Sequence, residues 1–124
     1  MSSLDVLIAA RNERFLARTI ADVLEHAELP ETRVIAVVED TWADPPIPDD
    51  PKVTIIHHES IGQRAAVNEA ARLSQATYVM KLDAHCGLDQ GFDRKLAEPY
   101  KSGELGRDVT TIPRLYNFWI FDWQ

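Results

Sequence analysis

The sequence predicts an α/β protein with a mainly parallel sheet and helices on both of its faces. Short apolar runs alternate with segments of helical periodicity, an order that produces right-handed crossovers between parallel strands. Polar residues follow the ends of several of these runs. The 124 residues are expected to form one domain, residues 1–124, and the 45% hydrophobic content excludes a disordered or fibrous chain.

Five apolar runs have the length and composition of buried strands. They are short, rich in Val and Ile, and bounded by polar residues or proline. Residues 41–52 hold four of the seven prolines and are expected to form a loop. The expected strands are residues 4–10, 34–38, 53–56, 78–82 and 109–112.

The first helix is expected between the first two strands. Leu16, Ile20 and Val23 recur at the spacing of one helical stripe, with charged residues on the other faces. Asn12 precedes this stripe and is a residue type that favours the N-cap position. We therefore expect Asn12 to cap this helix.

Two further helices are expected after the third and fourth strands. The second follows Gly62 and is rich in alanine, and its inner stripe is expected to contain Val67, Ala70, Ala71 and Ser74. The third covers roughly residues 90–101, where Pro99 is expected to bend or shorten it.

Composition and charge exclude several classes of protein. Thirteen Lys+Arg against twenty Asp+Glu give a net charge of −7, which argues against nucleic-acid binding by a basic surface. No apolar run approaches the roughly 20 residues of a membrane helix, and no secretion signal is visible, so a cytoplasmic protein is expected. The single cysteine excludes a disulfide framework and a zinc cage of several thiolates.

Three polar clusters stand at the carboxyl ends of expected strands. They are residues 11–13, residues 39–40 and residues 83–85. Parallel α/β sheets bind ligands beyond the carboxyl ends of their strands. The clusters therefore predict a ligand site at this edge, with the third cluster in the same crevice as the ends of the first two strands.

Asp83 and His85 are candidate metal ligands. Residues two apart at a strand end can turn toward one point, and a carboxylate with an imidazole suits Mn²⁺ or a similar cation. Two protein ligands hold a metal weakly, so a nucleotide diphosphate would have to supply further oxygens. The competing interpretation is an Asp that caps the next turn and a solvated His.

Acidic and basic residues near the same edge are candidate nucleotide contacts. Glu39 and Asp40 can accept hydrogen bonds from a base or a ribose, although acids also occur at strand ends beside loops without any ligand. Arg11 and Arg64 are candidates for phosphate contacts, Arg64 because it opens a helix whose amino end favours anions. Asn68 lies about one turn further along that helix. Surface salt bridges or a polar outer face would explain the same residues.

Three weaker signals have simple structural explanations. His57 and His58 are adjacent on a strand and point to opposite sides, which disfavours a shared metal. Cys86 is expected to be a small buried thiol rather than a nucleophile. Lys81 interrupts an apolar strand and marks an edge, a solvent-facing position or a buried partner for an acid.

Four motifs in this order resemble the nucleotide-sugar domain of GT-A glycosyltransferases, most of all family 2. They are residues 6–13 (VLIAARNE), 37–40 (VVED), 62–71 (GQRAAVNEAA) and 78–85 (YVMKLDAH), and the resemblance covers about residues 4–100. Residues 82–86 (LDAHC) are similar to the D-x-H segment of the polypeptide N-acetylgalactosaminyltransferases. The resemblance implies a three-layer, Rossmann-like GT-A fold.

The resemblance also implies roles for individual residues. Ala10, Arg11 and Asn12 would line the nucleotide pocket, and Glu39 would contact uracil or ribose, where the family more often has Asp. Arg64 would contact the ribose or the diphosphate, and Asn68 would brace the pocket. Asp83 and His85 would be the two protein ligands of Mn²⁺ or Mg²⁺. The implied activity is metal-dependent sugar transfer from a nucleotide-diphosphate donor, with UDP favoured and the acceptor unspecified.

The chain is shorter than typical members of this family, so a truncated or minimal enzyme is expected. Residues 116–124 hold five of the ten aromatic residues, and residues 113–124 are expected to begin an acceptor half or to form an interface between copies of the chain. One alternative is a nucleotidyltransferase, although residues 9–13 lack the glycine-rich loop it would usually need. The other alternative is a non-catalytic binding or assembly module.

Overall fold

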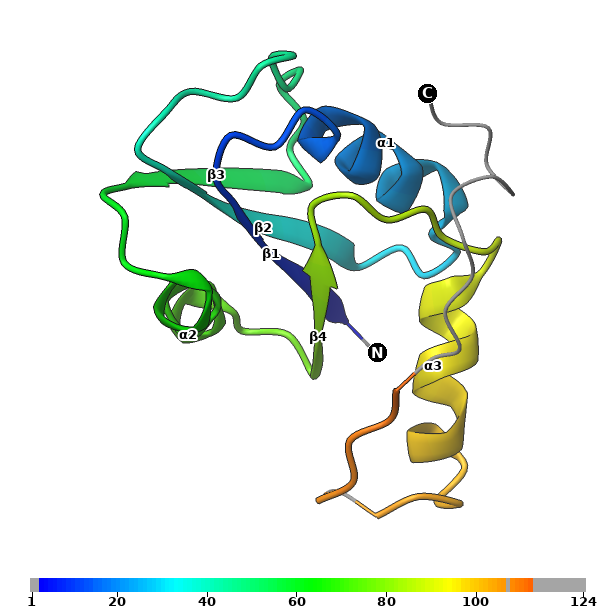
Figure 1. Ribbon diagram of the computed structural model, residues 1–124. Coiled ribbons are helices and arrows are strands. Elements are labelled where there is room, and N and C mark those ends of the chain that lie inside the picture. Colours follow the sequence, from blue (N-terminus) through cyan, green and yellow to red (C-terminus); the bar gives the residue numbers. More distant parts are fainter. Residues whose placement is uncertain (1–2, 107, 113–124) are drawn as a thin grey trace.

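A parallel sheet forms the centre of the molecule. Within residues 3–106 and 108–112, which the computed structural model describes, four strands pair in the order β3-β2-β1-β4 (Figure 1). All three strand pairs are parallel, as predicted. The strands are β1 Leu4–Ala10, β2 Thr32–Glu39, β3 Val53–His58 and β4 Tyr78–Asp83.

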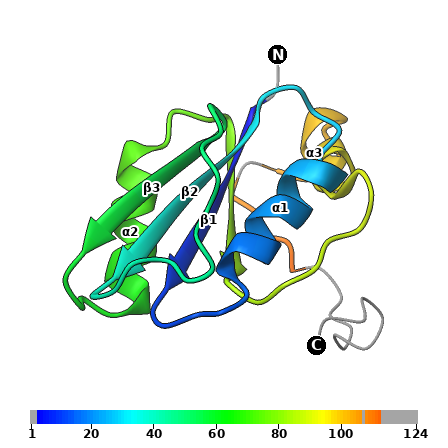
Figure 2. The ribbon, with the colours of Figure 1, turned by 90° about the horizontal axis from the view of Figure 1, so that it is seen from above.

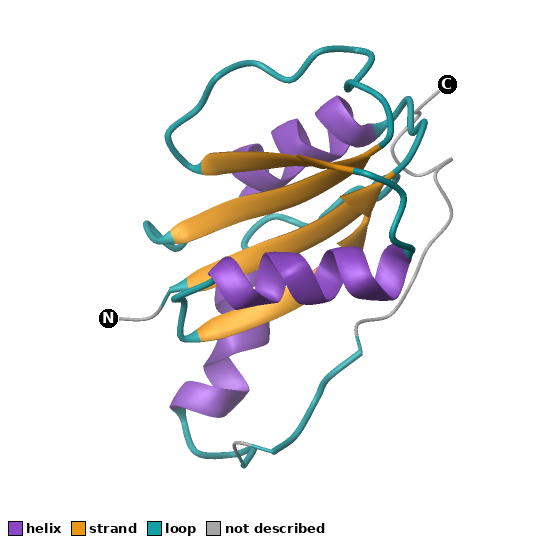
Figure 3. Ribbon diagram, turned by 90° about the vertical axis from the view of Figure 1, so that its left-hand side faces the viewer, coloured by secondary structure: helices purple, strands orange, loops and turns teal. Residues whose placement is uncertain are grey.

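Helices cover both faces of this sheet and complete a three-layer α/β fold. Helices α1 (Leu16–His26) and α3 (Phe92–Lys101) lie on one face, and α2 (Gln63–Leu73) lies on the other (Figures 2 and 3). The predicted Rossmann-like architecture is therefore confirmed. None of the helices in the described part of the chain is long and apolar enough to cross a membrane.

The side chains of β1 alternate between two hydrophobic clusters. Val6 and Ile8 pack with the stripe of α1 that the sequence predicts, Leu16, Ile20 and Val23. On the other face, the cluster under α2 consists of Leu7, Ile35, Val37, Ala66 and Ala70. Because β1 and β2 are buried on both faces, their nearly continuous apolar sequences are explained.

Helix α2 packs on the sheet through small side chains. Ala66 and Ala70, one helical turn apart, are both fully buried. Ala71, which was expected to face the sheet, is exposed instead. Val67 packs against the same cluster, as predicted, so the buried stripe differs by having Ala66 in place of Ala71. The alanine-rich sequence allows either alanine to take the inner position.

Replacing Ala70 by Leu is expected to destabilise the protein by about 1–3 kcal/mol, because the added methylenes have no space between helix and sheet. Ala71→Leu is the matched control on the same helix, and its exposed side chain predicts little change. Urea unfolding of both variants measures the difference. Equal stability of the two would contradict this packing.

The predicted fifth strand is wrong. Residues 109–112 form no strand, and Val109 and Ile112 are 42% and 88% exposed. The Val109 carbonyl instead accepts a hydrogen bond of 2.6 Å from the Tyr100 hydroxyl. An apolar run becomes a strand only where a neighbouring strand pairs with it and a helix or a second sheet covers it. The described residues provide neither here. The expectations for residues 113–124 lie outside the described part of the chain.

Two predicted helix ends also differ. Helix α1 begins at Leu16 with Phe15 at its N-cap position and without a side-chain cap, so Asn12 does not cap it. Helix α3 starts at Phe92 and continues past Pro99 to Lys101. Pro99 lacks an N–H and so removes one hydrogen bond of the helix, which ends two residues later.

Candidate functional site

The register of the sheet brings the predicted polar clusters to one edge. Ala9 of β1 lies opposite Asp83 of β4, and Ala10 lies opposite Val38 of β2. Residues 11–13, 39–40 and 83–85 therefore leave neighbouring strands at the same carboxyl edge. The expected proximity of the third cluster to the ends of the first two strands holds at the level of the backbone.

Polar contacts join the loops that follow β1, β2 and β3. The Thr41 hydroxyl donates to Asn12 Oδ1 at 3.2 Å, and Arg11 Nε lies 3.3 Å from Asp40 Oδ2. The backbone N–H of Ser60 donates to Asp40 Oδ1 at 2.8 Å. Asn12 and Asp40 both have positive φ angles, 53° and 64°, a conformation that Asn and Asp tolerate best among residues with a Cβ. These contacts hold three loops together beside the strand ends.

Asp83 and His85 contact different neighbours at this edge. Gln63 Nε2, at the start of α2, donates to Asp83 Oδ1 at 3.1 Å, and Lys81 Nζ lies 3.9 Å from the same oxygen. His85 Nδ1 lies 3.2 Å from Glu13 Oε2 in the loop after β1. Both Asp83 and His85 are exposed. They therefore connect β4 with α2 on one side and with the β1 loop on the other.

The chemistry of Asp83 and His85 fits a first-row divalent cation. They offer one carboxylate oxygen and one imidazole nitrogen at the edge where an anionic ligand would bind. Among the described residues, Asp83 and His85 are not part of a group of three His, Cys, Asp or Glu residues whose ligand atoms all lie within 4.8 Å of one another. A cation here would need further oxygens from its ligand or from water.

Glu39 is a buried acid whose carboxylate has no partner among the residues that the structure describes. It is only 4% exposed at the end of β2, on the face of the sheet that α2 covers. Its carboxylate makes no hydrogen bond or ion pair with the described residues. Among those residues, every side-chain oxygen that is fully enclosed has a hydrogen-bond partner. The Glu39 carboxylate has no such partner, so its tip must reach solvent. An ionised group in this position is available to accept hydrogen bonds from a ligand.

The other predicted site residues differ in what they can contribute. Ala10 is 7% exposed and its side chain joins the core under α1, so only its backbone can face a ligand. Arg64 lies in the first turn of α2, is exposed, and makes no ion pair with the described residues. Asn68 is exposed further along α2. Arg64 is therefore available for an anion near the amino end of its helix.

Two contacts of the candidate site differ from anything that the sequence predicts: Glu13 with His85, and Gln63 with Asp83. Gln63 directly follows Gly62 at the start of α2, and this position is the only hint of its role. The pairing of Glu13 with His85 spans 72 residues, so no local pattern could reveal it.

The weaker sequence signals have structural explanations. Lys81 is exposed on β4, an outer strand of the described sheet. The His57 ring packs against Trp42 with ring centroids 4.0 Å apart. Cys86 is half-buried, and burial, followed by the nearby charge of Asp83, raises the pKa of its thiol, which disfavours the nucleophilic thiolate.

One group of potential metal ligands lies away from the strand ends. Asp22, Glu25 and His26 on α1 have ligand atoms within 4.8 Å of one another, the one such group in residues 3–106 and 108–112. Two of the three already have protein partners: His26 Nδ1 lies 3.3 Å from Asp22 Oδ1, and Asp22 Oδ2 accepts from the Leu88 backbone N–H. The group ties α1 to the loop after β4.

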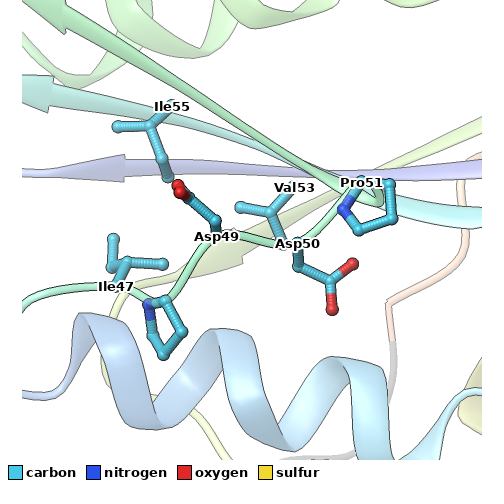
Figure 4. Close-up of a pocket in the computed structure, with 7 residues that line it drawn as sticks. Ile47, Asp49, Asp50, Pro51, Val53 and Ile55 are labelled. Carbon is cyan, nitrogen blue, oxygen red and sulfur yellow. The ribbon is translucent and has the colours of Figure 1, made fainter.

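A hollow of about 380 Å³ lies beside β3 (Figure 4). Figure 4 shows Ile47, Asp49 and Asp50 along the loop before β3, with Val53 and Ile55 on the strand itself. None of the strand-end residues described above lines it. This hollow is therefore separate from the candidate site.

Comparison with known proteins assigns the family. The parallel sheet, with helices on both faces and polar residues at its carboxyl edge, defines a three-layer α/β fold of the Rossmann-like class. The sequence profile described as "Glycosyl transferase family 2" matches residues 5–119. The chain therefore belongs to glycosyltransferase family 2, and its fold is the predicted GT-A fold. A search of curated proteins finds no match.

Solved structures share the fold at low sequence identity. The crystal structure of S. aureus TarS 1-349 is similar with a TM-score of 0.68 and 12% identity over 90% of this chain. A second crystal structure of S. aureus TarS gives a TM-score of 0.60, also with 12% identity over 90% of this chain. The chain spans 38% and 23% of the lengths of these two structures.

Proposed function

We propose that the carboxyl edge of the sheet binds a nucleotide-diphosphate sugar, with UDP as the nucleotide, and that the domain takes part in metal-dependent glycosyl transfer. The observation that carries this proposal is the Glu39 carboxylate, which is buried, has no side-chain partner in the described residues and reaches the surface at its tip. Burying a charge without a partner costs free energy. A ligand that donates hydrogen bonds to this carboxylate would offset that cost.

Nucleotide recognition in this proposal is divided among the loops. Glu39 accepts from the base or the ribose, while Arg11, Asn12 and the Ala10 backbone border the nucleotide. Arg11 would have to exchange its contact with Asp40 for a contact with phosphate, a small cost because the Arg11–Asp40 pair is largely exposed.

The diphosphate would lie near the amino end of α2. Arg64 supplies a positive charge there, and the unpaired N–H groups of the first turn add a partial positive charge. Asn68 braces this side of the pocket. An acidic protein with a net charge of −7 needs such a local concentration of positive charge to bind a diphosphate.

Asp83 and His85 would hold the divalent cation, Mn²⁺ or Mg²⁺, against the diphosphate. When bound, such a cation acts as a Lewis acid that stabilises charge on the departing nucleoside diphosphate. Gln63 fixes the orientation of the Asp83 carboxylate through its hydrogen bond. The protein's own contribution is then the placement of oriented polar groups before the reaction begins.

Calorimetric titration tests the proposal. We expect UDP to bind in the presence of Mn²⁺, and we expect Asp83→Ala to remove the metal-dependent part of the affinity. Asp49→Ala is the matched control, because Asp49 is exposed and lines the separate hollow beside β3. Metal-independent binding, or no binding of UDP by the unaltered protein, would refute the proposal.

A further inference from the structure

We infer that Glu13 is a positioning residue that fixes the ring tautomer of His85 so that its Nε2 atom coordinates the divalent cation. This inference rests on the proposed function, because it assumes a cation held by Asp83 and His85. The observation behind it is the distance of 3.2 Å between Glu13 Oε2 and His85 Nδ1.

The chemistry of this contact determines which ring nitrogen carries the proton. An ionised carboxylate only accepts hydrogen bonds, so Nδ1 must be the protonated nitrogen whether the imidazole is neutral or charged. In the neutral ring, the lone pair then belongs to Nε2. Metal-binding histidines commonly donate their other N–H to a carboxylate or carbonyl, which sets the ring orientation and increases the basicity of the ligating nitrogen.

Glu13 is itself held in place. Its Oε1 atom accepts a hydrogen bond of 3.3 Å from the backbone N–H of Phe15, so each carboxylate oxygen has a different partner. The Glu13 side chain is 24% exposed, whereas that of His85 is 52% exposed. The more buried partner, held by a second hydrogen bond, therefore orients the more exposed one. In the Arg33–Glu31 pair, by contrast, the side chains are 59% and 41% exposed.

The location of Glu13 links the two halves of the proposed site. Glu13 follows Arg11 and Asn12 in the loop after β1, and His85 follows β4. A ligand that rearranges the β1 loop would therefore also change the support of His85. This arrangement couples the nucleotide end of the site to its metal end through a single carboxylate.

Glu13→Ala and Glu13→Gln test the inference, with Glu31→Ala as the control for loss of an ion-paired glutamate. Nitrogen-15 NMR of the histidine rings in the metal-free protein reports the tautomer of His85. We expect the Nδ1–H form in the unaltered protein and in Glu31→Ala, and a shift away from it in Glu13→Ala. We expect Mn²⁺ affinity in the presence of UDP to fall about 10–100-fold in Glu13→Ala, as is typical when the support of a metal ligand is lost.

Glu13→Gln keeps an oxygen acceptor without the charge, so its Mn²⁺ affinity should lie between those of Glu13→Ala and the unaltered protein. It also carries the test if Glu13→Ala fails to fold. If the unaltered protein binds Mn²⁺ with UDP and both Glu13 variants bind it equally well, the inference is wrong while the proposed function stands. If the unaltered protein binds no Mn²⁺ with UDP, both are wrong.

Discussion

Replacing Asp93 by Asn is expected to lower the free energy of unfolding by about 2–4 kcal/mol, the range in which loss of a buried, fully bonded polar group falls. Asp93 is fully buried. Its carboxylate accepts from the Thr32 hydroxyl at 2.6 Å and from the backbone N–H groups of Glu28, Leu29 and Arg94. An amide NH₂ in place of one oxygen would face these donors without an acceptor. Chemical denaturation of the variant measures the loss.

Asp89→Asn is the matched control, because Asp89 precedes α3, is exposed and forms its ion pair with the exposed Lys95. Its loss should cost under about 1 kcal/mol. A loss for Asp93→Asn as small as that of the control would contradict the structural role of Asp93.

The stability supplied by Asp93 should also depend on pH. Burial raises the pKa of this carboxyl, but hydrogen bonds from Thr32 and the backbone outweigh burial and leave the pKa below its ordinary value. A carboxyl with a depressed native pKa binds its proton more weakly in the folded state than in the unfolded state. Its contribution is therefore complete above the unfolded pKa of about 3.9 and falls as the pH drops through the lower native pKa. The difference in stability between the unaltered protein and Asp93→Asn should narrow under acid.

Replacing Glu39 by Gln is expected to have opposite effects on binding and on stability. Nucleotide affinity should fall about 10–100-fold, since hydrogen bonds to charged groups contribute about 1.5–3 kcal/mol. The melting temperature should stay the same or rise, because the variant no longer buries a charge that lacks a partner in the described part of the chain. Titration with UDP and Mn²⁺, together with thermal unfolding, measures both.

Glu59→Gln is the control for Glu39→Gln, because Glu59 is an exposed glutamate that directly follows β3 at the same edge of the sheet. It should change neither quantity. A Glu39→Gln protein that binds UDP as well as the unaltered protein but unfolds more easily would mean that Glu39 has a structural role.

The four strands and three helices of the described chain could be predicted from the sequence because their signals are local. The apolar runs of β1 and β2 are buried on both faces, and the stripe of α1 has a clear helical period. The position of the candidate site at the carboxyl edge follows from the parallel order of the strands alone. Residue pairs such as Arg11–Asp40 could not be predicted, since their contact depends on loop conformations with positive φ at Asp40.

The errors share one physical cause, which is that local sequence does not specify the tertiary partner. Residues 109–112 have the composition of a strand, but no described strand pairs with them. The alanines of α2 allow several inner stripes, and packing on β1 and β2 selects Ala66 and Ala70. Asn12 has the chemistry of a cap, yet its side chain accepts from Thr41 instead.

In the proposed donor site, the small residues under α2 offer a way to alter donor preference. Ala66 and Ala70 let the helix axis approach the sheet closely, and the first turn of the same rigid rod carries Gln63 and Arg64. The distance between α2 and the sheet thus sets how far the Gln63 and Arg64 side chains extend over the carboxyl ends of the strands. Slightly larger or smaller side chains between α2 and the sheet would shift the Gln63 and Arg64 side chains by fractions of an ångström. Libraries aimed at new donors should therefore sample this remote contact layer as well as the residues that touch the ligand.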